Sequence, residues 1–526
     1  MAAEAHRGEG LLLVCYGGSR PPWASKRLKA KPEAGGKRRS SLAQASEFKK
    51  VSDVTWEIPK SFKQGMQVPA RLYATKKLLD AMDRGVIEQV TNVACLPGIV
   101  DYAYAMADAH WGYGFPIGGV AAFDLEKGVI SPGGIGFDIN CGMRLIRTNL
   151  RYSEVKPKVK ELVDLMFRLV PAGVGVKGFL RVTDSQFDEI VQYGVKWCAE
   201  NGLAWEDDPS HVEEGGFIKG ADPTKVSHQA KSRGIQQLGT LGSGNHYLEI
   251  QVVDPGRFLD RDLAKHFGIV HDDQVVVMVH CGSRGFGHQI GSDYLRIFDG
   301  AMKRYGLEVR DRELACAPYS SKEGRDYYGA MVCAANMAFT NRQVIVQKVR
   351  EAFSKVFHRD AESLDMGLVY DVCHNIAKVE RHRHDGASAD VLVHRKGATR
   401  SFGPGHPDIP SPYRSIGQPV IIGGSMETGS YLLIGTSKAM DETFGSTAHG
   451  SGRTMSRTAA KREVRGAELQ RRMMERGIYV KAATMDGLAE EAGMAYKDIS
   501  EVVETMDAAG ISKKVAALRP VGNIKG

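Results

Sequence analysis

The chain has 526 residues, of which 43% are hydrophobic and 25% are charged, a balance typical of a globular protein. No run reaches the eighteen or so apolar residues that a membrane-spanning helix needs. The formal net charge of +8 arises mainly in residues 1–50, where eleven Lys or Arg stand against four Glu, so bulk charge does not indicate a nucleic-acid partner.

Residues 1–50 are rich in Gly, Pro, Ser, Lys and Arg, which predicts a disordered basic N-terminal extension. A targeting role is compatible with this composition, and Lys37-Arg38-Arg39 is a weak candidate for nuclear import, but a solvated tail is the simpler interpretation. A globular domain is expected over residues 51–526.

Two segments precede the most distinctive stretch of the chain. Leu72 to Asp83 has apolar residues at helical spacing and is followed by Gly85, which predicts a helix that ends there. The glycine-rich segment 106–120 carries Asp108 and His110. These side chains could form hydrogen bonds to a metal ligand and orient it, or could stabilise the conformation of the loop.

Ser131 to Arg144 contains four glycines and a proline, which rule out a regular helix or a long strand. Its bend presents Asp138 and Cys141, a carboxylate and a thiol that can meet at one cation. Together with histidines, this mixture favours a divalent transition metal such as zinc or manganese. The eight cysteines are scattered without a CxxC pair, so neither a disulfide framework nor a zinc finger is expected. The protein is expected in a reducing compartment. Alone, the Asp-x-x-Cys segment would favour a glycine-rich turn with a buried thiol over a metal site.

The rest of the chain supplies the histidines. Lys158 to Val170 reads as an amphipathic helix whose apolar face belongs to the core. Beyond it, strands repeatedly adjoin a histidine beside a polar loop: Tyr247 to Val253 with His246, Val275 to Val279 with His280, Leu368 to Cys373 with His374, and Val391 to Val393 with His394. One histidine at a strand end is usually a surface or capping residue, but four such positions and the Asp-x-x-Cys loop predict a metal centre.

The C-terminal part adds features that suit a nucleotide. The strand Gln418 to Ile422 leads into Gly423-Gly424, whose backbone N–H groups could hold a phosphate or a purine edge, although no Walker or dinucleotide motif is matched. His449 lies among glycines near Arg453, which suits a nucleophile for phosphorus as well as an exposed turn. Residues 453–476 hold eight Lys or Arg against three Glu on a helical pattern, a solvated face or an RNA-binding one.

From about Val51 to Gly526 the chain resembles the RtcB family of RNA-splicing ligases. The resemblance rests on the motifs SPGGIGFDINCGMR, LGSGNHYLE, HCGSRGFGHQ, DVCHNIAKVE, VHRKGATR and AHGSGR. It implies an α+β fold with antiparallel sheets around a dinuclear metal cleft. It also implies a GTP- and Mn²⁺-dependent ligase that joins RNA ends carrying a 2′,3′-cyclic phosphate or 3′-phosphate to 5′-hydroxyl ends, in tRNA splicing and RNA repair. Cys281, where family members often have serine, and the variable loop 402–407 depart from the family without touching this chemistry.

The resemblance assigns residues by position. One manganese site corresponds to Asp138, Cys141 and His246, and the second to Cys141, His280 and His374, with the thiolate of Cys141 bridging two ions. The covalently guanylylated histidine corresponds to His449. His394 is not a metal ligand of the family, and with Arg395, Lys396 and Arg400 it is expected near RNA instead. The guanylate pocket corresponds to Asn245, His246, Tyr247, Leu248, Glu249, His374, Asn375, Gly423, Gly424, Ser425, Met426, Ser430, His449, Gly450, Ser451, Gly452 and Lys525.

The expected partners are GTP and RNA, namely tRNA exon halves, with archease and a DEAD-box helicase in a tRNA-ligase complex and no membrane. The expected location is cytoplasmic, nuclear or both, and targeting by the N-terminal extension remains an alternative. Two other functions compete with the ligase. A dinuclear metallohydrolase would use the same ligands but has no need of His449 or the purine loop. A non-catalytic RNA-binding scaffold would have no need of Asp138 and Cys141.

Overall fold

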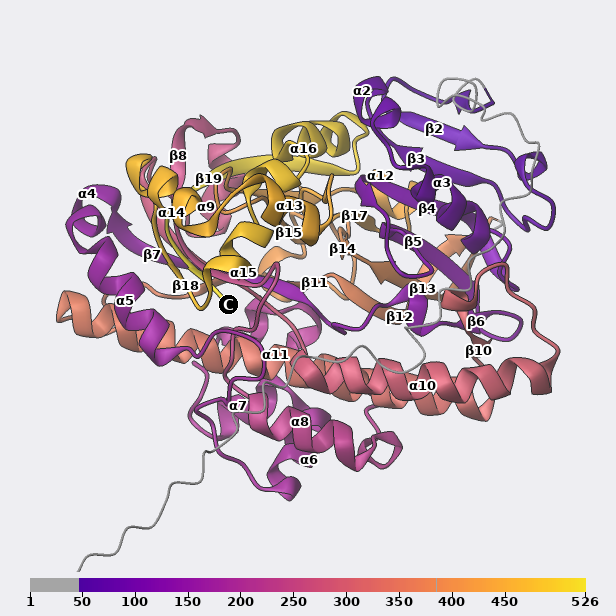
Figure 1. Ribbon diagram of the computed structural model, residues 1–526, viewed down its shortest axis with the longest axis horizontal. Coiled ribbons are helices and arrows are strands. Elements are labelled where there is room, and N and C mark those ends of the chain that lie inside the picture. The colour runs from indigo at the N-terminus through magenta and orange to yellow at the C-terminus, as the bar shows by residue number, and fades with distance from the viewer. Residues whose placement is uncertain (1–46, 385) are drawn as a thin grey trace, which may run out of the picture.

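The computed structural model describes residues 47–384 and 386–526 (Figure 1). Residues 1–46 of the expected basic extension lie outside the described residues. Its last two residues, Lys49 and Lys50, form the edge strand β1, so regular structure begins slightly before the expected boundary at residue 51. No helix in the described part of the chain is long and apolar enough to cross a membrane.

The first of two large sheets is formed by seven strands from the N-terminal third and the region around residue 390. Neighbouring strands are antiparallel except for β3 and β4, which are parallel. The order across the sheet is β1 (Lys49–Lys50), β2 (Thr55–Ile58), β3 (Ala70–Tyr73), β4 (Ile99–His110), β5 (Ile117–Asp124), β13 (Ala387–Lys396) and β12 (Asn375–His384).

The second sheet has eight strands and lies at the centre of the molecule. Its strand β9 reads as an uninterrupted apolar run because both of its faces are covered. Val275 and Val277 pack into one core cluster, and Val276 and Met278 pack into another. The order is β11 (Leu368–Cys373), β7 (Gly142–Arg151), β9 (Gln274–Cys281), β8 (Tyr247–Phe258), β19 (Ser512–Lys525), β16 (Ser430–Gly435) and β15 (Pro419–Gly423), with β18 (Tyr479–Ala482) parallel to β19. Two short ladders pair β6 (Val129–Ile130) with β10 (Ala317–Pro318), and β14 (Ala398–Arg400) with β17 (Ser446–Ala448).

Helices surround the two sheets. The longest, α10 (Arg284–Tyr305) and α11 (Lys322–Phe357), run across the molecule beneath the sheets as drawn in Figure 1, with further helices below them. The others are α2 (Lys76–Asp80), α3 (Arg84–Val93), α4 (Tyr152–Val155), α5 (Val159–Leu169), α6 (Asp184–Tyr193), α7 (Val195–Glu200), α8 (His228–Gln237), α9 (Arg261–His266), α12 (Ser437–Glu442), α13 (Arg457–Glu463), α14 (Gly466–Glu475), α15 (Met485–Glu490) and α16 (Ile499–Ala508). Short 3₁₀ turns include η2 (Pro132–Gly134), η5 (Glu213–Gly216) and η9 (Gly493–Ala495).

The expected fold class, α+β with antiparallel sheets, is confirmed. The helix expected at 158–170 is α5, and the strands expected near residues 250, 277, 370, 392 and 420 are β8, β9, β11, β13 and β15. The single helix expected from Leu72 to Asp83 is wrong. Leu72 lies in β3, Thr75 caps a short helix, and Asp83 caps a second one in which Gly85 is an interior residue. Two capping side chains therefore divide a segment that apolar spacing alone predicts to be one continuous helix.

One end of the central sheet collects the motif residues. There β9 ends just after His280, β8 begins just after His246, and β11 ends just before His374. The register places Met143 and Tyr247 opposite His280 on the two neighbouring strands. Antiparallel pairing therefore brings segments that are distant in the chain to the same end of the sheet.

Candidate active site

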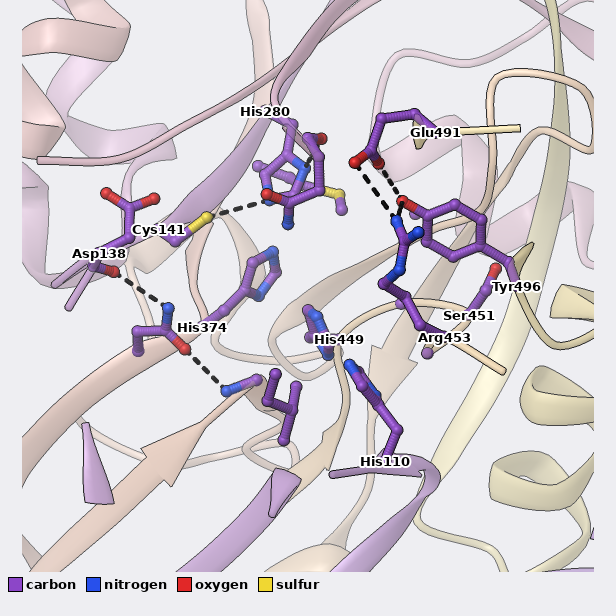
Figure 2. Close-up of a pocket in the computed structure, with 18 of the residues that line it drawn as sticks. His110, Asp138, Cys141, His280, His374, His449, Ser451, Arg453, Glu491 and Tyr496 are labelled. Atoms are coloured by element: carbon purple, nitrogen blue, oxygen red, sulfur yellow. Dashed lines mark hydrogen bonds and ion pairs between the residues drawn. The ribbon is translucent and has the colours of Figure 1, made fainter. Parts of the chain in front are cut away.

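A cavity of about 410 Å³ opens at this end of the central sheet. Figure 2 shows Asp138 and Cys141 on one side of it, Glu491 and Tyr496 on the opposite side, and His449 between them. The cavity thus joins the two groups of motifs that the sequence placed far apart, the glycine-rich loop before β7 and the segment after β17.

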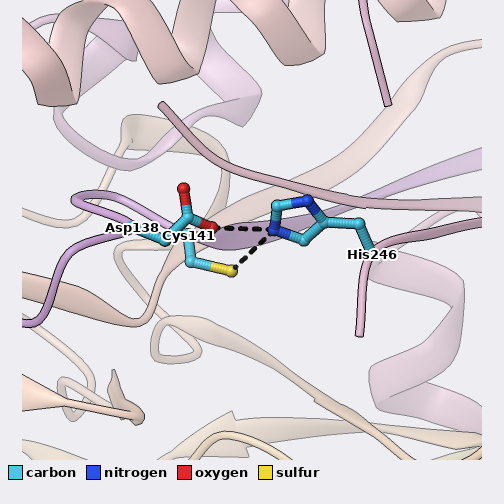
Figure 3. A group of neighbouring side chains, drawn as sticks. All are labelled: Asp138, Cys141 and His246. Atoms are coloured by element: carbon cyan, nitrogen blue, oxygen red, sulfur yellow. Dashed lines mark hydrogen bonds and ion pairs between the residues drawn. The ribbon is translucent and has the colours of Figure 1, made fainter. Parts of the chain in front are cut away.

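Asp138, Cys141 and His246 form a compact group whose ligand atoms all lie within 4.8 Å of one another (Figure 3). Nε2 of His246 lies 2.7 Å from Oδ2 of Asp138 and 3.5 Å from Sγ of Cys141. Nε2 of His280 lies 3.2 Å from the same sulfur atom. The thiol of Cys141 is therefore the one group that contacts both histidines.

Hydrogen bonds orient two of the histidines toward a cation. Nδ1 of His280 donates to the carbonyl oxygen of Asn245 at 3.0 Å, which leaves a lone pair on Nε2 of the neutral ring, the nitrogen that faces Cys141. Nδ1 of His374 lies 2.8 Å from the hydroxyl of Thr399, and its Nε2 is buried without a hydrogen-bond partner. An unpaired buried nitrogen that lines the same cavity as a thiol and a carboxylate fits a bound transition metal, which would satisfy it.

His246 is oriented differently. Arg284, which can only donate, places its guanidinium 3.2 Å from Nδ1 of His246, so the proton of the neutral ring sits on Nε2 and points at Asp138. Ligation of a cation through Nε2 therefore requires the proton to move to Nδ1 and Arg284 to withdraw from it.

The acid groups of the cluster are strongly perturbed. Burial alone would raise the pKa of Asp138, but His246 outweighs it and brings the pKa to about 2. Burial and the carboxylate of Asp138 raise the pKa of Cys141 well above its ordinary value. A divalent cation has the opposite effect on a thiol, because it stabilises the thiolate directly.

His449 is held by a carboxylate from a different sheet. Its Nδ1 lies 2.6 Å from Oδ2 of Asp108 in β4, and the backbone N–H groups of His449 and Gly450 donate to the same oxygen at 3.1 and 3.2 Å. Asp108 is completely buried. Burial would raise its pKa, but the contacts of His449 outweigh it and lower the pKa. A carboxylate fixes the proton of the neutral imidazole on Nδ1, so Nε2 carries the lone pair.

This contact changes the interpretation of segment 106–120. One expectation was that Asp108 supports a metal ligand. In the structure it contacts His449 instead. His110 also lines the cavity, and its Nδ1 donates to the carbonyl oxygen of Asp108 at 3.1 Å. Burial lowers the pKa of His110 to about 4, so its ring is neutral at pH 7.

The opposite wall of the cavity is charged. Arg453 donates to Glu491 at 3.3 Å and to the hydroxyl of Tyr496 at 3.1 Å, and Arg457 donates to the same carboxylate at 3.1 Å. Nζ of Lys525 donates to the carbonyl oxygen of Gly244 at 3.2 Å, and burial lowers its pKa. The expected neutralising residue, Arg453, is therefore at the cavity, but it is already paired with Glu491.

The residues expected to form a guanylate pocket separate into two groups. Leu248, Glu249 and Ser430 lie within the central sheet, where Gln251 donates to both Glu249 and Ser430. His246 is buried, is not among the residues that line the cavity, and belongs to the candidate metal-binding group with Asp138 and Cys141. The cavity itself is lined by Asn245, Tyr247, His374, Asn375, Gly423, Gly424, Ser425, Met426, His449, Gly450, Ser451, Gly452 and Lys525.

The expectation that His394, Arg395 and Arg400 lie near RNA is wrong, because all three are buried. Arg395 forms a two-pronged ion pair with Glu380 at 2.6 and 2.8 Å. His394 packs between the rings of Phe115 and Phe123 in the core of the first sheet. Arg400 pairs with Glu214.

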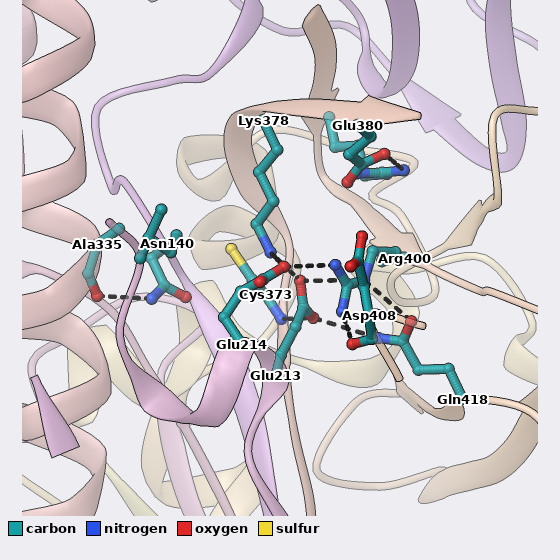
Figure 4. A network of polar contacts seen from close by, with 12 residues as sticks. Asn140, Glu213, Glu214, Ala335, Cys373, Lys378, Glu380, Arg400, Asp408 and Gln418 are labelled. Carbon is teal, nitrogen blue, oxygen red and sulfur yellow. Dashed lines mark hydrogen bonds and ion pairs between the residues drawn. The ribbon is translucent and has the colours of Figure 1, made fainter. Parts of the chain in front are cut away.

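Figure 4 shows the network in which Arg400 takes part, where Lys378 also contacts Glu213 and Glu214. Among the four residues expected near RNA, Lys396 alone lines the cavity. There it donates to the carbonyl oxygens of Tyr113, Phe115 and Gly133, and burial lowers its pKa to about 7.

Sequence reasoning did not identify Glu491 and Tyr496, which lie on the helical C-terminal segment and carry no motif. It noted Asp108 but gave it a different partner. The only signal for Asp108 was a carboxylate in a glycine-rich segment, and nothing local to residue 108 points to residue 449.

Comparisons with known proteins agree on one family. A sequence profile described as "tRNA-splicing ligase RtcB" matches residues 89–526. Curated proteins named tRNA-splicing ligase RtcB are similar over most of the chain. Those from Archaeoglobus fulgidus and Thermococcus kodakarensis are each 54% identical, over 479 and 480 residues, and that from Methanococcus maripaludis is 53% identical over 477 residues. Each match covers 91% of this chain and 99% of the relative.

Proposed function

The chain belongs to the tRNA-splicing ligase RtcB family, and from this premise we propose that it is a GTP- and Mn²⁺-dependent RNA ligase. It joins an RNA end carrying a 2′,3′-cyclic phosphate or a 3′-phosphate to a 5′-hydroxyl end through a guanylylated His449. The observation that carries the proposal is the contact between His449 and Asp108, which prepares a nucleophilic nitrogen in the same cavity as the Asp138 group.

The donor set supports one metal site directly, and the family resemblance extends it to a second. Asp138, Cys141 and His246 would hold one ion, and Cys141, His280 and His374 would hold a second, with the thiolate shared. Ions bound there would neutralise phosphate charge and polarise the phosphorus under attack. The mixture of carboxylate, thiolate and imidazole accommodates Mn²⁺ as well as Zn²⁺, and the choice of manganese rests on the family resemblance.

His449 performs the covalent step. Its Nε2 attacks the α-phosphorus of GTP, a P–N bond forms, and the bond to the β-phosphate oxygen breaks so that pyrophosphate leaves. Asp108 remains ionised and stabilises the positive charge that develops on the ring. Arg453, Arg457 and Lys525, which approach the cavity from the opposite wall, supply positive charge for the phosphate groups.

The RNA ends then react in turn. Water opens a cyclic phosphate to a 3′-phosphate, whose oxygen attacks the guanylyl phosphorus, and the P–N bond breaks to restore the lone pair of His449. The 5′-hydroxyl oxygen attacks the activated 3′-phosphorus, loses its proton, and GMP leaves. The resemblance also supports archease and a DEAD-box helicase as partner proteins, and a cytoplasmic or nuclear location.

The proposal is tested by incubating the protein with α-labelled GTP and Mn²⁺ in the absence of RNA. We expect an acid-labile, base-stable label on the peptide that contains His449, and no label with His449→Ala. That variant should still join RNA ends that already carry a guanylylated 3′-phosphate. Label on Lys396, or normal labelling of the variant, would overturn the mechanism. Release of phosphate from RNA without a joined product would favour the metallohydrolase.

A further inference from the structure

Three aromatic rings form a row that leads out of the catalytic cavity. The ring of Phe137 is stacked on that of His288, with centroids 4.9 Å apart and planes inclined by 27°. Tyr113 packs against Phe137 in an edge-to-face contact, with ring centroids 5.3 Å apart and planes inclined by 61°. Tyr113 and Phe137 line the cavity, whereas His288 is exposed on the first turns of α10. The row therefore runs from the cavity wall to the surface.

The position of Phe137 is set by its neighbours. It directly precedes the ligand residue Asp138, and it packs over Gly291, where a Cβ atom would lie only 3.2 Å from the ring. The missing side chain at Gly291 thus lets the ring approach α10 closely. Phe137 is partly exposed, and the core cluster beside it covers it only in part. A ring that is held in place, lines the cavity and is partly exposed offers an aromatic surface.

This row lies on the side of the cavity away from the charged wall. Figure 2 shows Asp138 on the opposite side of His449 from Glu491 and Tyr496. In the proposed function the charged wall and Lys525 belong to GTP, so the RNA end must approach from another direction. Arg233 of α8 is exposed close to the row, and after burial it is the main cause that lowers the pKa of His288. A cation beside exposed rings suits a single-stranded nucleic acid, whose phosphates and bases alternate.

We propose that the Tyr113–Phe137–His288 row is a stacking site for the terminal nucleobase of an RNA end. The inference rests on the proposed function and adds to it a contact that recognises the base rather than the phosphate. Stacking on aromatic side chains accepts every base because each has a π-face, so the site gives affinity without strict sequence preference. That property suits a ligase that must join ends of different sequence.

The test compares RNA ends with and without the terminal base. For wild-type protein, replacing the terminal nucleotide of the 3′-phosphate end or of the 5′-hydroxyl end by a ribose that lacks its base should raise KM for joining about 10-fold at one of the two ends, with kcat unchanged. His288→Ala should raise KM for the intact RNA by a similar factor and abolish the difference between intact and baseless ends. His288→Tyr, which restores a ring, should behave like wild type.

Controls separate this inference from the proposed function. Labelling of His449 with GTP should proceed normally in His288→Ala, because the row lies away from the charged wall, and circular dichroism should show an unchanged melting temperature. Phe137→Leu provides a second variant, with bound metal measured because Asp138 is adjacent. Binding of a fluorescent 3′-phosphate RNA and of a 5′-hydroxyl RNA, each with and without the base, gives a readout that does not need joining.

The outcomes are distinct. Failure of the wild-type protein to label His449 or to join RNA would overturn the proposed function. The comparison of RNA binding with and without the terminal base would still test the stacking site. Equal KM and equal binding for intact and baseless RNA at both ends would overturn the stacking site and leave the ligase intact. An effect of the missing base that persists undiminished in both His288→Ala and Phe137→Leu would place the base elsewhere and also overturn it.

Discussion

Oδ2 of Asp108 lies 2.6 Å from Nδ1 of His449, although 341 residues separate the two in the chain. The carboxylate is fully buried and accepts two further hydrogen bonds from the backbone N–H groups of His449 and Gly450. One side chain therefore fixes the position of the imidazole, its tautomer and the conformation of the segment that carries it.

The first prediction concerns this contact. Asp108→Asn should slow the labelling of His449 by GTP at least about 100-fold, because an amide can donate to Nδ1 and favour the wrong tautomer, and it cannot stabilise the charged ring. Single-turnover labelling measures the effect. Asp101→Asn, which alters a carboxylate of the same strand that contacts His384, is the matched control and should label normally. Equal rates for the two variants would contradict the assignment.

The second prediction concerns the shared thiol. Cys141→Ala should abolish RNA joining and remove both metal ions, since Sγ contacts the histidines of both predicted sites. Metal content measured by mass spectrometry should fall from two ions per chain to none, with the melting profile of the metal-free protein little changed. Cys316→Ala, at another buried thiol outside the cluster, should keep both ions. Two ions retained in Cys141→Ala would rule out a bridging thiolate.

The third prediction refines the expected role of the basic segment 453–476. Its cations differ, because Arg453 and Arg457 are paired with Glu491, whereas Arg462 and Arg465 are exposed beside a surface hollow of about 520 Å³. Arg462→Gln combined with Arg465→Gln should weaken RNA binding.

The salt dependence of this double variant gives the quantitative check. The slope of log affinity against log salt should become shallower by about 1.4, as expected for two phosphate contacts of a single strand, while GTP labelling persists. Lys219→Gln combined with Lys303→Gln removes the same charge from exposed positions elsewhere and should leave the slope unchanged. A similar change of slope in both double variants would indicate an effect of net charge rather than a binding surface.

The fourth prediction concerns acid stability. Burial would raise the pKa of Glu214, but Lys378 and Arg400 outweigh it and lower the pKa to about 2, from an ordinary value of 4.5. Because the folded-state pKa is the lower one, this carboxylate contributes stability that is fully present above pH 4.5 and is lost as the pH falls toward 2.

Glu214→Gln should therefore reduce the free energy of unfolding by roughly 3 kcal/mol at pH 7, since it leaves two buried cations with one partner fewer. Urea unfolding at pH 7 and at pH 3 measures the effect. The difference in free energy of unfolding between wild type and variant, the gap, should be smaller at pH 3. Glu206→Gln, at an exposed position, should show no such gap. A gap that is as wide at pH 3 as at pH 7 would contradict the pKa assignment.

The sequence alone determined the kind of chemistry and the elements that carry it. Asp138, Cys141 and His280 were predicted as metal ligands from residue type and from their places beside glycines and strand ends, and the structure places them at one cavity. Such features are local, since a glycine-rich turn or a buried strand is specified by a few consecutive residues. The assignment of His449 as the covalent residue came from the family resemblance and remains a prediction.

Only the tertiary structure decided which charged groups are paired and which are free. Arg395 and Arg400 look like surface cations in a strand, yet both are buried. Glu380 reaches Arg395 from the neighbouring strand β12, and Glu214 reaches Arg400 from η5, 186 residues away in the chain. Asp108 and His449 meet for the same reason, through the packing of β4 beside the segment after β17. A buried charge requires a partner, and that partner is chosen by the folding of distant segments against each other, which no local pattern of residues records.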